Sequence, residues 1–139
     1  MDAWEALYRA QVTVLRRLRV GFPDEELSLS EYDVLFNLSR MPGHAARIRD
    51  LNRQLLLTQP SVSRLLDRIA ARGLVTKNED PRDARGTIVT LTDEGYSLFR
   101  RIGAEHAAAI AELMTALSPE ELAELTRLTD KLRRGVDPR

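Results

Sequence analysis

The stretch TQPSVSRLLDRIAARG at residues 58–73 decides the fold, because it has the pattern of an amphipathic helix. Thr58 suits the N-cap, Pro60 falls in the first turn, where its missing N–H costs nothing, and Gly73 is a typical helix stop. Apolar side chains recur at helical spacing and predict one buried side. We expect that side to hold Val62, Leu65, Leu66 and Ile69, and the opposite, exposed side to hold Ser63, Arg64, Asp67 and Arg68.

A β-hairpin is predicted directly after this helix. Two short β-prone runs, LVTK at 74–77 and TIVTL at 87–91, flank a polar tip, NEDPRDARG, at 78–86. Thr92 is then placed to cap a long helix over about 93–116. A short helix, a tight turn, a polar-faced helix and a hairpin, in this order, are typical of a winged helix-turn-helix.

Apolar periodicity predicts further helices before and after this region. The first runs over residues 3–20, the second starts at Ser30 with Asp33 three residues later, and a short third helix covers about 46–55. SPEE at 118–121 opens the last helix with Ser at the cap, Pro at the first position and Glu at the third, which is a capping box. The fold class is therefore mainly α with a small β-hairpin wing, and its winged helix-turn-helix is flanked by long terminal helices.

Length and composition predict one folded, soluble domain over residues 1–139. Hydrophobic residues make up 43% and charged residues 30%, which argues against disorder. Because the chain has no cysteine, disulfides, thiol redox sensing and thiolate metal ligands are excluded. No apolar stretch approaches the roughly 18 residues of a membrane helix, and the start lacks a secretory pattern, so we expect a cytoplasmic protein without a membrane partner.

The charge distribution favours a polyanionic partner although the net charge is zero. Residues 44–85 hold nine basic and five acidic side chains, whereas residues 1–43 hold five and seven, and residues 86–139 hold seven and nine. The middle third is therefore positive between two acidic ends. Local fields, rather than net charge, steer a polyanion. A solvated charged surface is the alternative interpretation.

The exposed side of the helix over 58–73 is predicted to read DNA. A helix fits the major groove, and its N-terminal residues meet the base edges. We expect Arg64 to bind guanine through two hydrogen bonds, with Gln59 and Ser63 beside it. Thr58 and Ser61 are expected to contact phosphate or cap the helix. The predicted recognition set is Thr58, Gln59, Pro60, Ser61, Ser63, Arg64 and Arg68, the alternative being that the two arginines only solvate a surface helix.

Taken together, QPSVSRLLDRIAARGLV, DPRDAR and TLTDEG resemble the MarR family of bacterial winged helix-turn-helix transcription regulators, over essentially the whole chain. The most specific part is a wing pattern D-x-R-x-x-R followed by L-T-x-x-G. Six residues meet it: Asp80, Arg82, Arg85, Leu91, Thr92 and Gly95. The resemblance implies a sequence-specific DNA-binding regulator, and a repressor is the role we expect.

The resemblance also assigns roles within the wing. It implies that Arg82 enters the minor groove, where narrow A·T tracts concentrate negative potential. We expect Asp80, two residues earlier, to accept hydrogen bonds from the Arg82 guanidinium and so restrict its rotamers. Arg85 would brace the loop or bind phosphate, and Lys77 completes the predicted wing set. The alternative is an ordinary exposed ion pair worth about 0–1 kcal/mol.

The terminal helices predict a homodimer. They carry apolar side chains that one chain of this size cannot all bury, at Trp4, Leu7, Leu15, Leu18, Leu113, Leu117, Leu122, Leu125 and Leu128. We therefore assign residues 30–91 to a DNA-binding lobe and residues 1–20 and 93–134 to dimerisation helices. A two-fold axis would set two recognition helices about 34 Å apart, which fits an inverted-repeat operator in double-stranded DNA.

A small-molecule effector is expected beside the DNA. The resemblance implies a small phenolic or lipophilic effector that weakens DNA affinity, with Tyr8, Arg16, Tyr32 and Phe36 as lining residues. The alternative is that these aromatic side chains belong to the buried core.

An enzyme is not expected, because the chain has only two histidines and no phosphate loop or catalytic triad pattern. A metal-responsive regulator using His44 and Glu105-His106, or a dimeric adaptor that does not bind DNA, stays open. We predict no metal and no cofactor.

Overall fold

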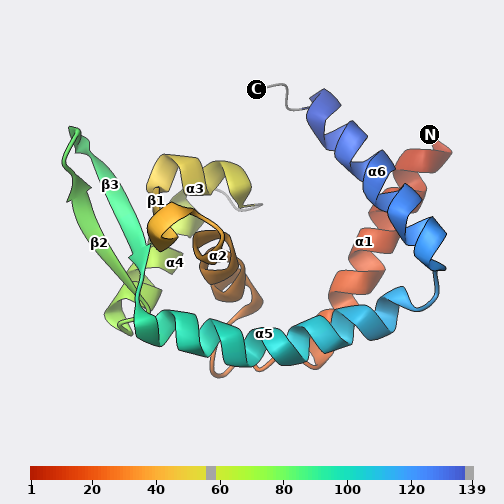
Figure 1. The fold of residues 1–139 in the computed structure, drawn as a ribbon, viewed down its shortest axis with the longest axis horizontal. Coiled ribbons are helices and arrows are strands. Elements are labelled where there is room, and N and C mark those ends of the chain that lie inside the picture. Colours follow the sequence, from red (N-terminus) through yellow and green to blue (C-terminus); the bar gives the residue numbers. More distant parts are fainter. Residues whose placement is uncertain (56–58, 137–139) are drawn as a thin grey trace. The chain divides into compact units, whose positions relative to one another are not determined.

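The computed structural model describes residues 1–55 and 59–136, and of Gln59 and Pro60 only the backbone. The predicted N-cap Thr58 therefore lies outside the described residues. No helix in the described ranges is long and apolar enough to cross a membrane. These ranges contain six α-helices and three strands, labelled in Figure 1: α1 (Asp2–Val20), α2 (Leu29–Ser39), β1 (Ala45–Arg47), α3 (Ile48–Gln54), α4 (Gln59–Ala71), β2 (Val75–Asp80), β3 (Asp83–Leu91), α5 (Asp93–Met114) and α6 (Pro119–Val136).

The chain divides into two compact units. Residues 19–105 form one, here called the lobe, and residues 1–18 with 106–139 form the other, here called the terminal unit. The lobe holds the helix-turn-helix of α3 and α4 and the hairpin of β2 and β3, which extends away from the helices (Figure 1). The mainly α-helical fold with a hairpin wing is confirmed.

The lobe contains its own hydrophobic core. The predicted apolar side of α4 is confirmed, because Val62, Leu65, Leu66 and Ile69 are all buried there. They pack in one cluster with side chains from α2, α3, the sheet and α5, at Leu35, Leu38, Leu51, Val89 and Ile102. Each fully buried aliphatic side chain contributes about 1.5–3 kcal/mol. This core fixes α4 against the sheet.

Helix α2 begins two residues earlier than the sequence predicted. Its N-cap is Ser28, not Ser30, and a complete capping box joins Ser28 to Glu31. The Ser28 N–H donates to Glu31 Oε2 at 2.9 Å, and the Glu31 N–H donates to Ser28 Oγ at 3.2 Å. The prediction with Asp33 was wrong because Glu31 satisfies the cap from the third helical position, which leaves Ser30 inside the helix.

The sheet has one strand more than the sequence predicted, and a longer hairpin. Its order is β1-β3-β2, with all neighbours antiparallel. Because Ala45–Arg47 pairs with β3, helix α3 starts at Ile48 rather than near residue 46. The expected nine-residue polar tip was wrong: β2 and β3 stay paired through Glu79 and Thr87, with a register shift between Glu79 and Asp80. Backbone pairing holds the parts of these strands next to the turn, although most side chains there are polar and exposed.

Backbone contacts join the end of α4 to the start of α5. Gly73 and Leu74 donate their N–H groups to carbonyls of the last turn of α4, which confirms Gly73 as the helix stop. The Thr92 hydroxyl donates to the Gly73 carbonyl at 2.7 Å and accepts the Gly95 N–H at 3.0 Å, so the predicted cap is confirmed. A Cβ at Gly95 would lie 2.0 Å from the Leu74 carbonyl oxygen, so only glycine fits this close approach.

The terminal unit differs from the lobe in its burial. Among the described residues of α6, none is buried, and several large apolar side chains of α1 and α6 are exposed. The predicted capping box at the start of α6 is confirmed, since Ser118 and Glu121 exchange hydrogen bonds of 2.8 and 3.2 Å. This helix is therefore well formed locally, while Leu125, Leu128, Leu132 and Val136 stay exposed to solvent.

Candidate nucleic-acid interface

The outer side of α4 presents polar side chains to solvent. Ser63, Arg64, Asp67 and Arg68 are exposed, as the helical spacing predicted. Of the described side chains, none forms an ion pair or hydrogen bond with Arg64, so its five donors are available to an external acceptor. Ser61 is half-buried in the first part of the helix. The side chains of Gln59 and Pro60 lie outside the described residues, so these two predictions stay predictions.

Two side chains predicted to contact DNA are engaged within the chain. Arg68 Nε lies 3.5 Å from Glu31 Oε1, and Lys77 Nζ lies 2.6 Å from Asp67 Oδ1. The first contact joins α4 to α2, and the second joins α4 to β2. Arg68 is still 62% exposed, so its pairing with Glu31 leaves part of the guanidinium accessible. Both pairs hold α4 in place between its neighbours.

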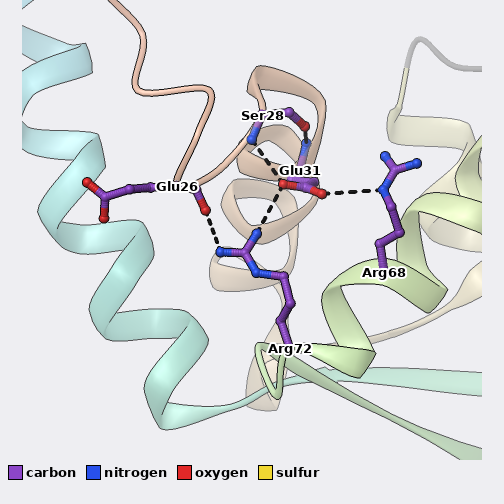
Figure 2. A network of polar contacts seen from close by, with 5 residues as sticks. All are labelled: Glu26, Ser28, Glu31, Arg68 and Arg72. Atoms are coloured by element: carbon purple, nitrogen blue, oxygen red, sulfur yellow. Dashed lines mark hydrogen bonds and ion pairs between the residues drawn. The ribbon is translucent and has the colours of Figure 1, made fainter.

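Figure 2 shows the polar network that anchors the C-terminal end of α4. Arg72 Nη1 lies 3.4 Å from Glu31 Oε2, and its Nη2 donates to the Glu26 backbone carbonyl. The Glu26 carboxylate in turn pairs with Arg101 of α5 at 2.6 Å, and this hydrogen bond lowers the pKa of Glu26. Glu31 is buried and faces Arg68 of α4 and Arg72, which directly follows this helix. The sequence offered a signal for it, because a Glu three residues after Ser28 is a capping box.

The tip of the wing is organised around Asp80, but not as predicted. Its side chain is buried, and its Oδ1 accepts the backbone N–H of Arg82 at 2.9 Å. Its Oδ2 pairs with the guanidinium of Arg47 from β1. The expectation that Asp80 binds the Arg82 guanidinium was therefore wrong: the carboxylate shapes the turn through the backbone and is neutralised from another strand. Arg47 gave no signal in the sequence, because the two residues are far apart along the chain.

Cationic side chains of the wing remain accessible. Arg82 and Arg85 are exposed and have no ion-pair partner among the described residues. Asp83 Oδ1 accepts the Arg85 N–H at 3.1 Å, which fixes the backbone just after the turn. Beside Arg85 lies a hollow of about 300 Å³ between the wing and the start of α3; its lining residues are Arg47, Ile48, Arg49, Asp83, Arg85, Gly86 and Thr87. The wing and the start of α3 thus form one positively charged surface.

The residues predicted for an effector pocket fall into both units. Tyr32 and Phe36 belong to an aromatic cluster of the lobe, where the Tyr32 ring centroid lies 5.4 Å from that of Phe99. Burial raises the pKa of Tyr32. Tyr8 and Arg16 belong to the terminal unit and are exposed, with Tyr8 stacked on Trp4 at 6.0 Å. The effector pocket stays a prediction.

The two histidines have aromatic or buried surroundings. His44 stacks on Tyr96, with ring centroids 5.2 Å apart, and burial lowers the pKa of His106. Over the described part of the chain, no group of three or more His, Asp or Glu side chains is arranged to hold a metal ion.

Comparison with known proteins agrees with this architecture. The MarR family model matches residues 26–86. Sco3205, a MarR family transcriptional regulator of Streptomyces coelicolor solved in complex with DNA, is similar with a TM-score of 0.85 and 24% identity, over 98% of this chain and 86% of that one. BpsR of Bordetella bronchiseptica, whose DNA binding is regulated by 6-hydroxynicotinic acid, is similar with a TM-score of 0.84 and 24% identity, over 96% of this chain and 99% of that one. The S. coelicolor regulator PcaV, bound to its natural ligand, is similar with a TM-score of 0.76 and 27% identity, over 95% of this chain and 91% of that one.

A helix-turn-helix followed by a hairpin, both with exposed arginines, defines a winged-helix protein of the kind found in transcription regulators. The MarR family model matches this part of the chain, and the chain shares the fold of MarR family transcriptional regulators over nearly its whole length. The family and the similar structures are regulators, not enzymes.

Proposed function

We propose that this protein is a sequence-specific DNA-binding repressor that binds an inverted-repeat operator as a homodimer and is released by a small-molecule effector. One observation carries the proposal: Arg64 on α4 and Arg82 and Arg85 on the wing are exposed and lack ion-pair partners within the described residues. Exposed arginines on a helix suit base edges in the major groove, and those on a hairpin suit the minor groove or the phosphates.

The homodimer is supported by the apolar side chains of the terminal unit. Leu128 and Leu132 of α6 are about half exposed in the single chain, and Trp4 of α1 is 65% exposed. Apolar surface of this kind gains free energy when a second copy covers it. A two-fold dimer would present two α4 helices to two half-sites, which is why we propose an inverted repeat.

The effector is supported by aromatic side chains and by relatives. The lobe has a half-buried aromatic cluster around Tyr32 and Phe36. DNA binding by BpsR is regulated by 6-hydroxynicotinic acid, and PcaV was solved with its natural ligand. A flat, apolar molecule with a polar substituent suits such a cluster, because aromatic faces stack and the Tyr32 hydroxyl offers one polar group.

The test is a selection of genomic DNA fragments by the purified protein, followed by anisotropy titration of the selected duplex at several salt concentrations. We expect an inverted repeat whose affinity falls steeply with salt, because cationic contacts release counterions. Arg64→Ala should cost about 1–3 kcal/mol and relax the preference at one position of each half-site. Arg100→Ala, which removes one exposed charge from α5, is the matched control and should change neither the affinity nor the base preference. Salt-independent binding, or no selected repeat, would contradict the proposal.

A further inference from the structure

The ion pair between Arg47 and Asp80 spans the whole width of the sheet. Arg47 lies on β1 and Asp80 on β2, and β3 runs between these two strands. The Asp80 side chain is 2% exposed and that of Arg47 is 25% exposed. A buried carboxylate needs a close counter-charge, since an unpaired one is costly. Arg47 supplies that charge from the segment that leads into the helix-turn-helix.

Gly86 of β3 leaves room for this contact. A Cβ at this position would lie 3.2 Å from Asp80 Cβ and 3.2 Å from the Asp83 carbonyl oxygen. It would also lie 3.5 Å from Asp80 Oδ2, the oxygen that pairs with Arg47. A larger side chain would therefore crowd the space around the carboxylate. Strand β3 therefore carries no side chain at Gly86, next to the carboxylate of Asp80 that Arg47 reaches from β1.

The second oxygen of the same carboxylate holds the turn of the wing. Asp80 Oδ1 accepts the N–H of Arg82, and only Pro81 separates the two residues. The register shift between Glu79 and Asp80 places the carboxylate at the base of this turn. Arg47, the Asp80 carboxylate and the Arg82 backbone thus form one continuous chain of contacts. Arg47 is also the N-cap residue of α3, so the chain of contacts begins at the helix-turn-helix.

We infer that Arg47 is a positioning residue for DNA recognition: through Asp80 it fixes the direction in which the wing presents Arg82. The inference rests on the proposed DNA binding and deepens it, because it makes the helix-turn-helix and the wing one oriented unit. A wing arginine reads the narrow minor groove of A·T pairs only if it enters at a defined angle. Loss of Arg47 should therefore reduce the preference for A·T pairs under the wing more than overall affinity.

The experiment compares two operators that differ only in the base pairs under the wing, A·T or G·C, by anisotropy titration at one fixed salt concentration. The quantity measured is the ratio of the two dissociation constants. This ratio does not depend on the active fraction of the protein, so a merely destabilised variant keeps it. The wild type should prefer the A·T operator by on the order of tenfold, the scale of one specific arginine contact, and Arg82→Ala should abolish that preference.

Three variants test the role of Arg47. Arg47→Met should bring the ratio close to one. The single variant leaves Asp80 buried and unpaired and so risks misfolding. A double variant, Arg47→Met with Asp80→Asn, removes both charges and keeps an acceptor for the Arg82 N–H. This double variant should give the same ratio. Adding Arg82→Ala to this double variant should change the ratio no further. Arg49→Met is the matched control: it removes one charge from the same hollow and should weaken both operators equally.

A DNA-free measurement separates this inference from the proposed function. Amide hydrogen exchange at Arg82 should be faster in Arg47→Met and in the double variant than in the wild type and in Arg49→Met. An unchanged operator ratio, or unchanged exchange at Arg82, would overturn the positioning role. If faster exchange were seen in a protein that binds no operator at all, the contact chain would stand, but DNA binding and the role of Arg47 in it would both be refuted.

Discussion

Helix α4 of the lobe and helix α6 of the terminal unit are both strongly amphipathic, yet the two units differ in what covers the apolar sides of these helices. In the lobe, Leu66 of α4 is fully buried against α2, α3 and the sheet. In the terminal unit, α6 has no buried side chain among its described residues, and Leu128 is 48% exposed. The lobe supplies its own partner surfaces, and the terminal unit does not.

Under the proposed function, this difference suits the two units to different tasks. A core closed within one chain gives α4 and the wing a fixed geometry in every copy of the protein. An open apolar surface gains its stabilising contacts from another chain, so its stability depends on protein concentration. The lobe is therefore the unit suited to recognition, and the terminal unit is the one suited to association.

Removal of residues 118–139 should have the largest effect on the oligomeric state and on operator binding. The deletion takes away α6, so we expect a monomeric or poorly soluble product that no longer binds the full operator. Light scattering gives the oligomeric state and anisotropy titration the binding. Circular dichroism should still report the folded lobe. A truncated chain that remained a dimer would show that α6 is dispensable for association.

Truncation of one leucine in each unit should separate their contributions. Leu66→Ala should lower the free energy of unfolding by about 2–5 kcal/mol, because it leaves a cavity in the closed core of the lobe. Leu128→Ala should hardly change the stability of a single chain but should weaken the dimer, so that its unfolding midpoint falls on dilution more than that of the wild type. Urea denaturation at several protein concentrations measures both. A dilution effect in Leu66→Ala alone would reverse the assignment.

Neutralising one glutamate in each unit should give a smaller contrast. Glu31→Gln keeps the capping hydrogen bonds of α2 but removes the charge facing Arg68 and Arg72, and should lower the free energy of unfolding by about 1 kcal/mol. Glu124→Gln breaks the exposed pair with Arg127 and should have no measurable effect. Urea denaturation at fixed protein concentration compares the two. Equal effects would mean that burial of Glu31 contributes nothing.

The smallest expected effect is a pH dependence from His106. Burial lowers its pKa from the usual 6.5, so the unfolded chain binds a proton at a higher pH than the folded chain. The free energy of unfolding should therefore fall as pH drops from about 6.5, and level off below the folded pKa. His106→Gln should remove this slope between about pH 5 and 8, whereas His44→Gln should keep it. Thermal unfolding at a series of pH values detects the difference.

Local and periodic features of this fold could be predicted from the sequence. The spacing of Leu65, Leu66 and Ile69 fixed the buried side of α4, since helical geometry alone decides which residues share a side. The stop at Gly73, the cap at Thr92 and the capping box at Ser118 depend on hydrogen bonds within a few residues. The partners in such contacts are close together in the sequence, so the residue types at neighbouring positions are enough to predict them.

Contacts between distant segments were decided only by the tertiary structure. Strand β1 is three residues long and has no apolar alternation of its own; it becomes a strand because β3 offers it backbone partners. Glu31 meets Arg68 and Arg72 only when α2 and α4 pack together. Asp80 looked like the partner of the Arg82 side chain because the two are neighbours in sequence. Folding instead buries its carboxylate beneath the wing, and a buried charge takes the cation that the sheet brings nearest, Arg47.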